Sequence, residues 1–260
     1  MTEIDAPQPG LPAVRVVGAG APFRWLAAGW RDFRANPLPS AFYGACFAVM
    51  GWLVYIVFQH AYPYVSALVT GFFLVGPFLA IGLYALSRRR ERGEPPWLAP
   101  TLDAWAPNKS AIGLFALVLA VILLLWARAS LVVFALFFTQ DVPSLQDFVG
   151  QVFSVGNLEF LLVYLCVGGF FAILVFAISV VSVPMMLDRD TDGIVAVLTS
   201  LKAATANISA MIVWGLVIVV LVAFGFATWF VGLIVAVPVI GHATWHAYRD
   251  LVAPAGAGNP

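Results

Sequence analysis

Hydrophobic residues in this chain come in blocks about 20 residues long, separated by short polar stretches, which is the pattern of membrane-spanning helices. The last block, Ile208 to Ile240, runs for 33 residues without a charged side chain. That length is too great for one ordinary span and suits two short ones. How this block divides therefore decides the number of spans and the side on which the chain ends.

The pattern predicts an all-α, polytopic membrane protein with six transmembrane helices. They pair into three helical hairpins over about residues 40–86, 110–184 and 208–248. The fourth span is expected to end at Pro184. In the last hairpin, residues 225–227 are expected to form a tight outer turn before a sixth span from Thr228 to Tyr248.

Each hairpin follows a short segment that we expect to lie along the membrane surface as an amphipathic helix. These segments are residues 23–36, a Trp-containing stretch within 93–108, and 194–206. In the third, Ile194 and Leu198 contribute to an apolar stripe at helical spacing.

Internal similarity supports three repeated units. An Asn precedes each hairpin, at Asn36, Asn108 and Asn207, and a Ser-Ala pair follows each Asn at the start of the hairpin. Two spans also share a pattern at identical spacing: Gly71, Pro77, Tyr84 and Arg88 in the second, and Gly232, Pro238, Trp245 and Arg249 in the sixth.

The basic residues predict the topology. Arg88, Arg89, Arg90 and Arg92 lie between the second and third spans, whereas the loops after the first and third spans carry neither Lys nor Arg. The positive-inside rule then places the N-terminus in the cytoplasm. With six spans the C-terminus is cytoplasmic too, and with five it would be outside.

Composition agrees with this class. Of 260 residues, 62% are hydrophobic and 10% are charged, far below the charge of a soluble domain, and the formal net charge of zero gives no indication of nucleic-acid binding. Residues 1–22 and 253–260 read as disordered tails around a single transmembrane domain, residues 23–252.

The chain resembles the bacterial predicted integral membrane proteins of the DUF2189 family. The resemblance is carried by Pro184–Asp192, by residues 198–203 with Asn207, and by the ending Gly241–Val252. It implies a multi-pass protein of the bacterial inner membrane. Some members are labelled putative cytochrome c oxidases, a label that a haem-copper catalytic subunit would justify only with several histidines on different spans.

His242 and His246 are four residues apart and share one helix face, so they are candidate cofactor ligands. The third histidine, His60, belongs to an outer turn about 30 Å away across the hydrocarbon core. The alternative interpretation is an anchor at the membrane surface, together with Trp245, Tyr248 and Arg249. Haem or metal binding is not expected.

Asp188, Asp190, Asp192 and Gly193 match the opening of a calcium-binding loop. The position that needs a bidentate Glu is Thr199. The alternative is a solvated turn whose carboxylates cap the next helix.

Arg128 is the one basic residue inside an apolar block, and Glu159 begins the next span at a comparable level. We expect these two to form an ion pair that closes the second hairpin. Pro77 and Pro238 are expected to kink their helices.

No catalytic constellation or phosphate-binding glycine loop is apparent, so no enzymatic activity is expected. The sequence favours a non-catalytic accessory, assembly or lipid-organising factor, with the bilayer and a membrane-protein partner as its surroundings. A small transporter or channel built from the hairpin repeats is the alternative. The third interpretation is a cofactor-binding subunit of a respiratory oxidase. The oligomeric state stays open.

Overall fold

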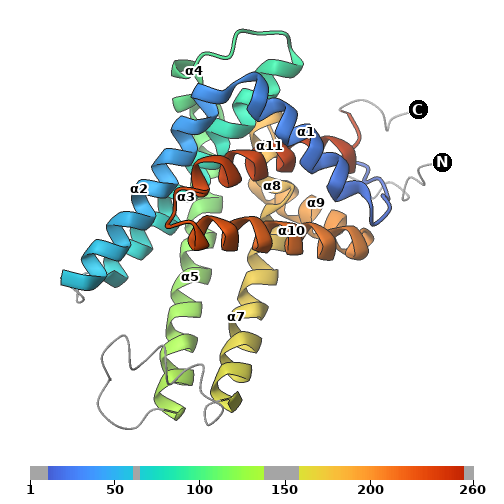
Figure 1. The fold of residues 1–260 in the computed structure, drawn as a ribbon. Helices are drawn as coiled ribbons and strands as arrows, with labels where there is room; N and C mark the ends of the chain where they lie inside the picture. Colours follow the sequence, from blue (N-terminus) through green and yellow to red (C-terminus); the bar gives the residue numbers. More distant parts are fainter. Residues whose placement is uncertain (1–10, 61–64, 138–157, 255–260) are drawn as a thin grey trace. The chain divides into compact units, whose positions relative to one another are not determined.

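A computed structural model describes residues 11–60, 65–137 and 158–254, and every regular element in these ranges is a helix (Figure 1). The helices of the first two predicted hairpins and their leading segments are α1 (Ala21–Ala35), α2 (Pro37–His60), α3 (Val65–Glu91), α4 (Ala99–Leu102), η2 (Ala106–Asn108), α5 (Lys109–Phe137), α7 (Leu158–Ser179) and α8 (Ser182–Asp188). The remaining helices are α9 (Gly193–Ala206), α10 (Ile208–Ala227) and α11 (Leu233–Leu251). Part of the predicted turn after the first span and the predicted loop after the third lie outside the described residues.

The described chain falls into two compact units, residues 1–116 with 177–260, and residues 117–176. In the second unit, α5 and α7 are joined by a hydrogen bond that Ser130 Oγ donates to Tyr164 Oη over 3.0 Å. One turn further along, the rings of Phe134 and Phe160 meet edge to face with centroids 6.3 Å apart. These contacts fix the antiparallel register of the two helices.

In the first unit, α11 is the helix around which the others pack. It contacts α1, α2, α3, α8 and α10 (Figure 1). Small residues let neighbouring backbones come close. A methyl group at Gly44 would lie 2.4 Å from the carbonyl oxygen of Ile234, and one at Gly29 would lie 2.6 Å from the backbone of α11. Glycine is therefore required at both positions by the closeness of the helices.

The turn before α11 differs from the prediction. Residues 225–227 end α10, and the turn occupies residues 228–232. Trp229 and Phe230 both have positive φ, a conformation rarely adopted by large residues. A contact from another helix stabilises this turn, because Trp52 Nε1 of α2 donates a hydrogen bond to the Trp229 carbonyl over 2.8 Å.

The break before α8 also lies earlier than predicted. Helix α7 ends at Ser179, and Pro184 lies inside the first turn of α8, where a missing N–H costs no helical hydrogen bond. The hydroxyl of Ser200, on α9, stabilises the break. It accepts from Val181 N over 3.1 Å and donates to the Ala177 carbonyl over 2.7 Å.

Most of the predicted N-terminal tail that the structure describes is ordered, contrary to our expectation. Val14 is fully buried and forms an antiparallel bridge with Val252. Backbone hydrogen bonds of 2.8 Å from Arg15 N and 3.0 Å from Ala253 N support the bridge. Val17 N also donates to Asn207 Oδ1 over 2.7 Å. Burial of Val14 and Val17 stabilises this segment. The prediction of disorder rested on the Pro, Gly and Ala residues around them, and composition gives no information on this packing. Residues 1–10 and 255–260 lie outside the described residues.

The three sequence repeats predicted above correspond to a recurring arrangement of a short helix, an Asn and a long helix. Asn36 separates α1 from α2, Asn108 ends η2 before α5, and Asn207 separates α9 from α10. The elements α3, α8 and α11, which come late in each unit, contact one another. Pro77 and Pro238 lie inside α3 and α11, as the matched spacing implies.

Within the described residues, four stretches are long and apolar enough to cross a membrane by length and composition: Pro37–His60, Ala99–Phe137, Leu158–Asp188 and Ile208–Ala227. The predicted second and sixth spans coincide with α3 and α11, which are not among them, so the count of six is not confirmed. Helix α11 carries His242, His246, Arg249 and Asp250 in its second half and buries most of its residues in the protein.

Helix α9 has its apolar stripe on the outside. Ile194 and Leu198 are exposed, whereas the small residues Ala196, Ser200 and Ala203 are buried. Small residues inside and large apolar residues outside are typical of a helix that faces lipid. The predicted amphipathic segment is therefore a helix, and its apolar face points away from the protein.

Candidate functional site

A chain of hydrogen bonds links four buried polar residues from four different helices. Ser40 lies in the first turn of α2, His242 in α11, Ser87 near the end of α3 and Asp32 near the end of α1. Ser40, Ser87 and His242 are fully buried, and Asp32 is 5% exposed. Buried polar groups are tolerated when they satisfy one another, and this chain does so.

Both nitrogens of the His242 ring contact a serine hydroxyl. Ser40 Oγ lies 2.9 Å from Nε2, and Ser87 Oγ lies 2.8 Å from Nδ1. Ser87 donates its single hydroxyl proton to Asp32 Oδ2 over 2.7 Å. His242 Nδ1 must then donate to Ser87, and Nε2 accepts from Ser40, so every proton in the chain is directed towards Asp32.

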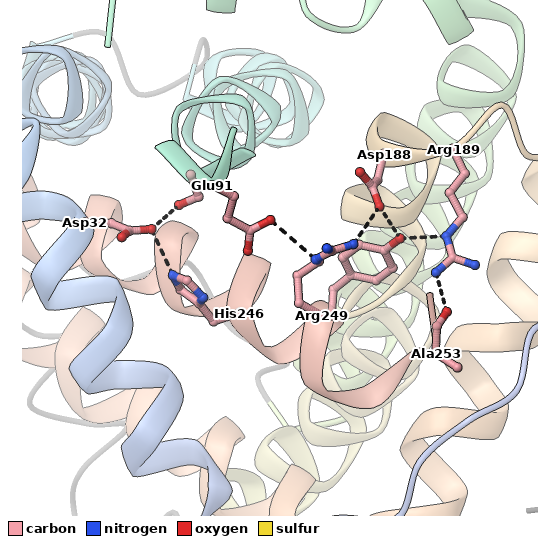
Figure 2. Close-up of polar contacts among 9 residues, drawn as sticks. Asp32, Glu91, Asp188, Arg189, His246, Arg249 and Ala253 are labelled. Carbon is pink, nitrogen blue, oxygen red and sulfur yellow. Dashed lines mark hydrogen bonds and ion pairs between the residues drawn. The ribbon is translucent and has the colours of Figure 1, made fainter. Parts of the chain in front are cut away.

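Asp32 is the acceptor at which the chain ends. Its Oδ2 also accepts from His246 Nε2 over 2.9 Å (Figure 2). Its Oδ1 accepts from the guanidinium of Arg90 over 2.7 Å. Burial acts to raise the pKa of the Asp32 carboxyl, but the hydrogen bonds that it accepts from His246 and Ser87 outweigh this effect. The net result is a pKa below the usual value of an aspartate, so the carboxylate is ionised.

The chain of hydrogen bonds reaches the surface at a shallow pocket of about 260 Å³. Three helices line it, α1, α3 and α11, through Ala28, Arg31, Asp32, Ser87, Arg90, Glu91 and His246. His246 and Arg90 are partly exposed there, with side chains 24% and 40% accessible. The pocket therefore has charged side chains in its lining, among them the buried carboxylate of Asp32.

A second group of polar contacts joins α8 to α11 (Figure 2). Tyr248 Oη donates to Asp188 Oδ2 over 2.8 Å and accepts from Arg189 Nε over 2.9 Å. Arg249 lies 3.3 Å from Asp188 and 3.4 Å from Glu91, a residue of the pocket. The ends of α3, α8 and α11 thus carry one connected set of charged and hydrogen-bonding side chains.

The predicted cofactor ligands have other contacts. Both ring nitrogens of His242 are engaged by serines, and His246 Nε2 is engaged by Asp32. A metal or haem iron on His242 must break one of these hydrogen bonds. The alternative of a surface anchor is wrong for His242, Trp245 and Tyr248, because all three are fully buried within the protein.

The carboxylates of the predicted calcium loop do not converge. Asp188 accepts from Tyr248, Asp192 accepts from Ile194 N as the N-cap of α9, and Asp190 is exposed. Among the described residues, no group of three or more His, Cys, Asp or Glu side chains is placed to hold a metal ion. The capping role that we considered for this stretch is the one that Asp192 has.

The predicted ion pair between Arg128 and Glu159 does not form: both side chains are described and exposed, and no salt bridge joins them. The helix register explains this. With Ser130 opposite Tyr164 and Phe134 opposite Phe160, Arg128 lies level with Cys166. Glu159 lies seven residues before Cys166 on α7, so about 10 Å along the helix axis separates it from the level of Arg128, at about 1.5 Å per residue.

Three of the arginines that we used to predict topology also hold the end of α3. Arg88 donates to the Leu187 carbonyl of α8, Arg89 pairs with Glu94 at 2.8 Å, and Arg90 pairs with Asp32. Arg92 is exposed. These side chains therefore link helices as well as marking a basic loop.

Sequence reasoning missed Asp32, Ser40 and Ser87 as members of the site. Asp32 lies among the arginines of the predicted amphipathic segment 23–36, Ser40 belongs to a repeated Ser-Ala pair, and Ser87 follows the apolar run of the predicted second span. One signal was available. Asp32 is the single acidic residue in a helix with three arginines, and it recurs at helical spacing with Trp25 and Gly29, on the face that packs on α11.

Comparison with protein families supports the resemblance noted in the sequence. The family model described as "Predicted integral membrane protein (DUF2189)" matches residues 65–188. This segment includes Ser87, the arginines after it and Asp188, but not residues 198–207 or the ending 241–252. Neither the curated proteins nor the solved structures gave a match.

Proposed function

We propose that this integral membrane protein, whose residues 65–188 belong to the DUF2189 family, acts without catalysis of its own as an accessory, assembly or lipid-organising factor of the bacterial inner membrane. Both termini lie in the cytoplasm in this proposal, which rests on the basic residues around α1 and after α3. The six-span arrangement is part of the same proposal.

One observation carries the proposal: the buried polar residues bind one another. Ser40, Ser87 and His242 have no exposed surface, and Asp32 accepts hydrogen bonds from Arg90 and His246. A nucleophilic serine or an acid-base histidine must reach a substrate. Ser40 and His242 have the contact that such a pair needs, but their burial leaves them the role of joining α2 to α11.

The outward surface fits a protein that works through its contact with lipid and with membrane partners. On α10, large apolar side chains are exposed at helical spacing, at Ile208, Ile212, Leu216, Val219, Val220 and Phe224. On α1, Phe23 and Trp30 are exposed beside arginines, as in helices that lie at the headgroup level.

A small transporter or channel is the second candidate. The threefold recurrence of short helix, Asn and long helix favours it, and so do Pro77 and Pro238 inside two helices that contact each other. The third candidate, a cofactor-binding subunit, is disfavoured by the serine contacts on both nitrogens of His242.

Affinity purification from native membranes in a mild detergent, followed by mass spectrometry of proteins and lipids, tests the first proposal. We expect a membrane-protein partner or specific lipids in fixed proportion to the chain. Protein that arrives with neither, and that catalyses solute uptake in liposomes, would replace this proposal with the transporter. A Soret band in the visible spectrum would favour the cofactor-binding subunit.

A further inference from the structure

The pocket between α1, α3 and α11 is lined by two arginines, Arg31 and Arg90, and by two carboxylates that already have partners within the protein. The carboxylate of Asp32 is bound by Arg90 and His246, and Glu91 faces Arg249. Arg31 also lines the pocket and is exposed, and within the described residues it forms no hydrogen bond or ion pair. A guanidinium at the rim of a pocket suits an anionic ligand with several acceptor oxygens.

The position of the pocket along the chain places it at the level of lipid headgroups. Arg31 lies on α1, which presents Phe23 and Trp30 outward. The span Pro37–His60 begins directly after α1, and Ser40 in its first turn is connected to Asp32 through His242 and Ser87. The pocket and the start of a membrane span are thus parts of one rigid set of contacts.

The size of the pocket favours a small polar group over a whole soluble ligand. Pockets that enclose drug-sized molecules measure about 300–1,000 Å³. This one measures about 260 Å³ and is open to the surface. A headgroup fits such a pocket while the apolar remainder of the lipid stays in the membrane.

We propose that the pocket at Arg31, Arg90 and His246 binds the phosphate group of a phosphate ester, as found in the headgroup of a glycerophospholipid. Arg31 supplies the principal contact, and the guanidinium of Arg90, held in place by Asp32, supplies a second. The ligand class rests on the proposed function, since a lipid-organising factor needs a site that distinguishes lipids by their headgroups.

The test is a titration of purified full-length protein in a non-ionic detergent, with thermal unfolding as the readout. The probes are dihexanoyl phosphatidylglycerol, dihexanoylglycerol, which lacks the phosphate, and glycerol 3-phosphate, which lacks the acyl chains. Arg31→Gln removes the proposed contact. Arg34→Gln is the matched control, because Arg34 is exposed on the same helix and does not line the pocket.

We expect a saturable rise in the melting temperature with dihexanoyl phosphatidylglycerol and none with dihexanoylglycerol. Arg31→Gln raises the half-saturating concentration at least about 10-fold, as expected for a lost charge-assisted hydrogen bond, while Arg31→Lys retains part of the binding and Arg34→Gln retains all of it. Saturation by glycerol 3-phosphate at the same concentration supports the phosphate site and identifies a soluble ester as its source.

Two outcomes would overturn the site. Equal weakening in Arg31→Gln and Arg34→Gln would show diffuse attraction to a basic helix. An equal response to dihexanoylglycerol would show that phosphate is not recognised. Neither outcome removes the broader proposal, because co-purification of a protein partner is measured separately and does not depend on Arg31.

Discussion

Ser87 Oγ donates a hydrogen bond to Asp32 Oδ2 over 2.7 Å, and through this contact the buried His242 is connected to a carboxylate at the surface pocket. The two residues lie on α3 and α1, 55 positions apart. Removal of the Ser87 hydroxyl takes one donor from Asp32, which keeps those from His246 and Arg90, and leaves His242 Nδ1 without an acceptor. Ser87→Ala is expected to lower the free energy of unfolding by about 1–3 kcal/mol.

Thermal unfolding in detergent, converted to free energy, measures this loss. Ser209→Ala is the control, because Ser209 is exposed at the start of α10. Equal stability of the two variants would mean that the Ser87 contact contributes nothing.

The lowered pKa of Asp32 makes stability depend on acidity. A carboxyl whose pKa is lower in the folded state stabilises the fold fully above its unfolded pKa, near 3.9. The contribution is lost as the pH falls through the folded value. The wild type should therefore lose stability below about pH 4, whereas Asp32→Asn should be less stable at neutral pH and lose less on acidification.

Melting temperatures measured from pH 7 to pH 3 test this expectation. Asp103→Asn, at an exposed position, serves as the control for the general effect of acid. Parallel curves for the wild type and Asp32→Asn would contradict the role of Asp32.

Gly44 allows α2 to approach α11 closely, and a methyl group there would overlap the Ile234 backbone. Gly44→Ala is expected to destabilise the protein by about 1–3 kcal/mol, since overpacking forces the backbones apart. Gly215 is also helical, and nothing lies within 4 Å of a methyl group placed there. Gly215→Ala should be neutral or slightly stabilising, because alanine favours helix. Denaturation of the two variants side by side distinguishes packing from helix propensity.

The register of α5 and α7 predicts which polar pair is coupled. A double-mutant cycle of Ser130→Ala and Tyr164→Phe should give a coupling of about 0.5–1.5 kcal/mol, the net value of a hydrogen bond. The cycle of Arg128→Ala and Glu159→Ala should be additive within about 0.5 kcal/mol, because about 10 Å separates their levels. The reverse result would show that the helices pack in a different register.

Asn207 holds the segment before α1 by accepting from Val17 N and donating to the Arg15 carbonyl over 3.1 Å. Asn207→Ala removes both contacts. Hydrogen exchange followed by mass spectrometry should then show faster exchange at Val17 and its neighbours, with little change in α5. Thr205→Ala, exposed on the preceding turn, is expected to leave this exchange unchanged. Unchanged protection in Asn207→Ala would mean that burial of Val14 suffices to hold the segment.

Periodicity predicted the helices well because length and apolarity are local properties of the sequence. The boundary between α1 and α2 at Asn36 is an example, because the predicted amphipathic segment 23–36 ends there. The break at Ser179 was not, because a hydroxyl from Ser200 on another helix stabilises it. A tertiary contact of this kind leaves no periodic trace near the break.

The site shows the same limit more strongly. The spacing of His242 and His246 identified the right helix face, but not the partners on that face. Asp32 and Ser87 become a pair only when α1 and α3 pack on α11, and hydrophobic periodicity carries no information on which polar residues meet. The Arg128–Glu159 pair failed for a related reason, since matching the levels of two residues requires the register of their helices.

The bridge between Val14 and Val252 constrains the route of the chain through the membrane. Two segments joined by backbone hydrogen bonds occupy the same side of the bilayer, whatever path the chain takes between them. We therefore expect the polypeptide to cross an even number of times. Four crossings and six both satisfy this parity, and five do not. A topology reporter fused to the N-terminus and one fused to the C-terminus should consequently both lie on the same side of the membrane. Reporters found on opposite sides would mean that the bridge between Val14 and Val252 does not form in the membrane.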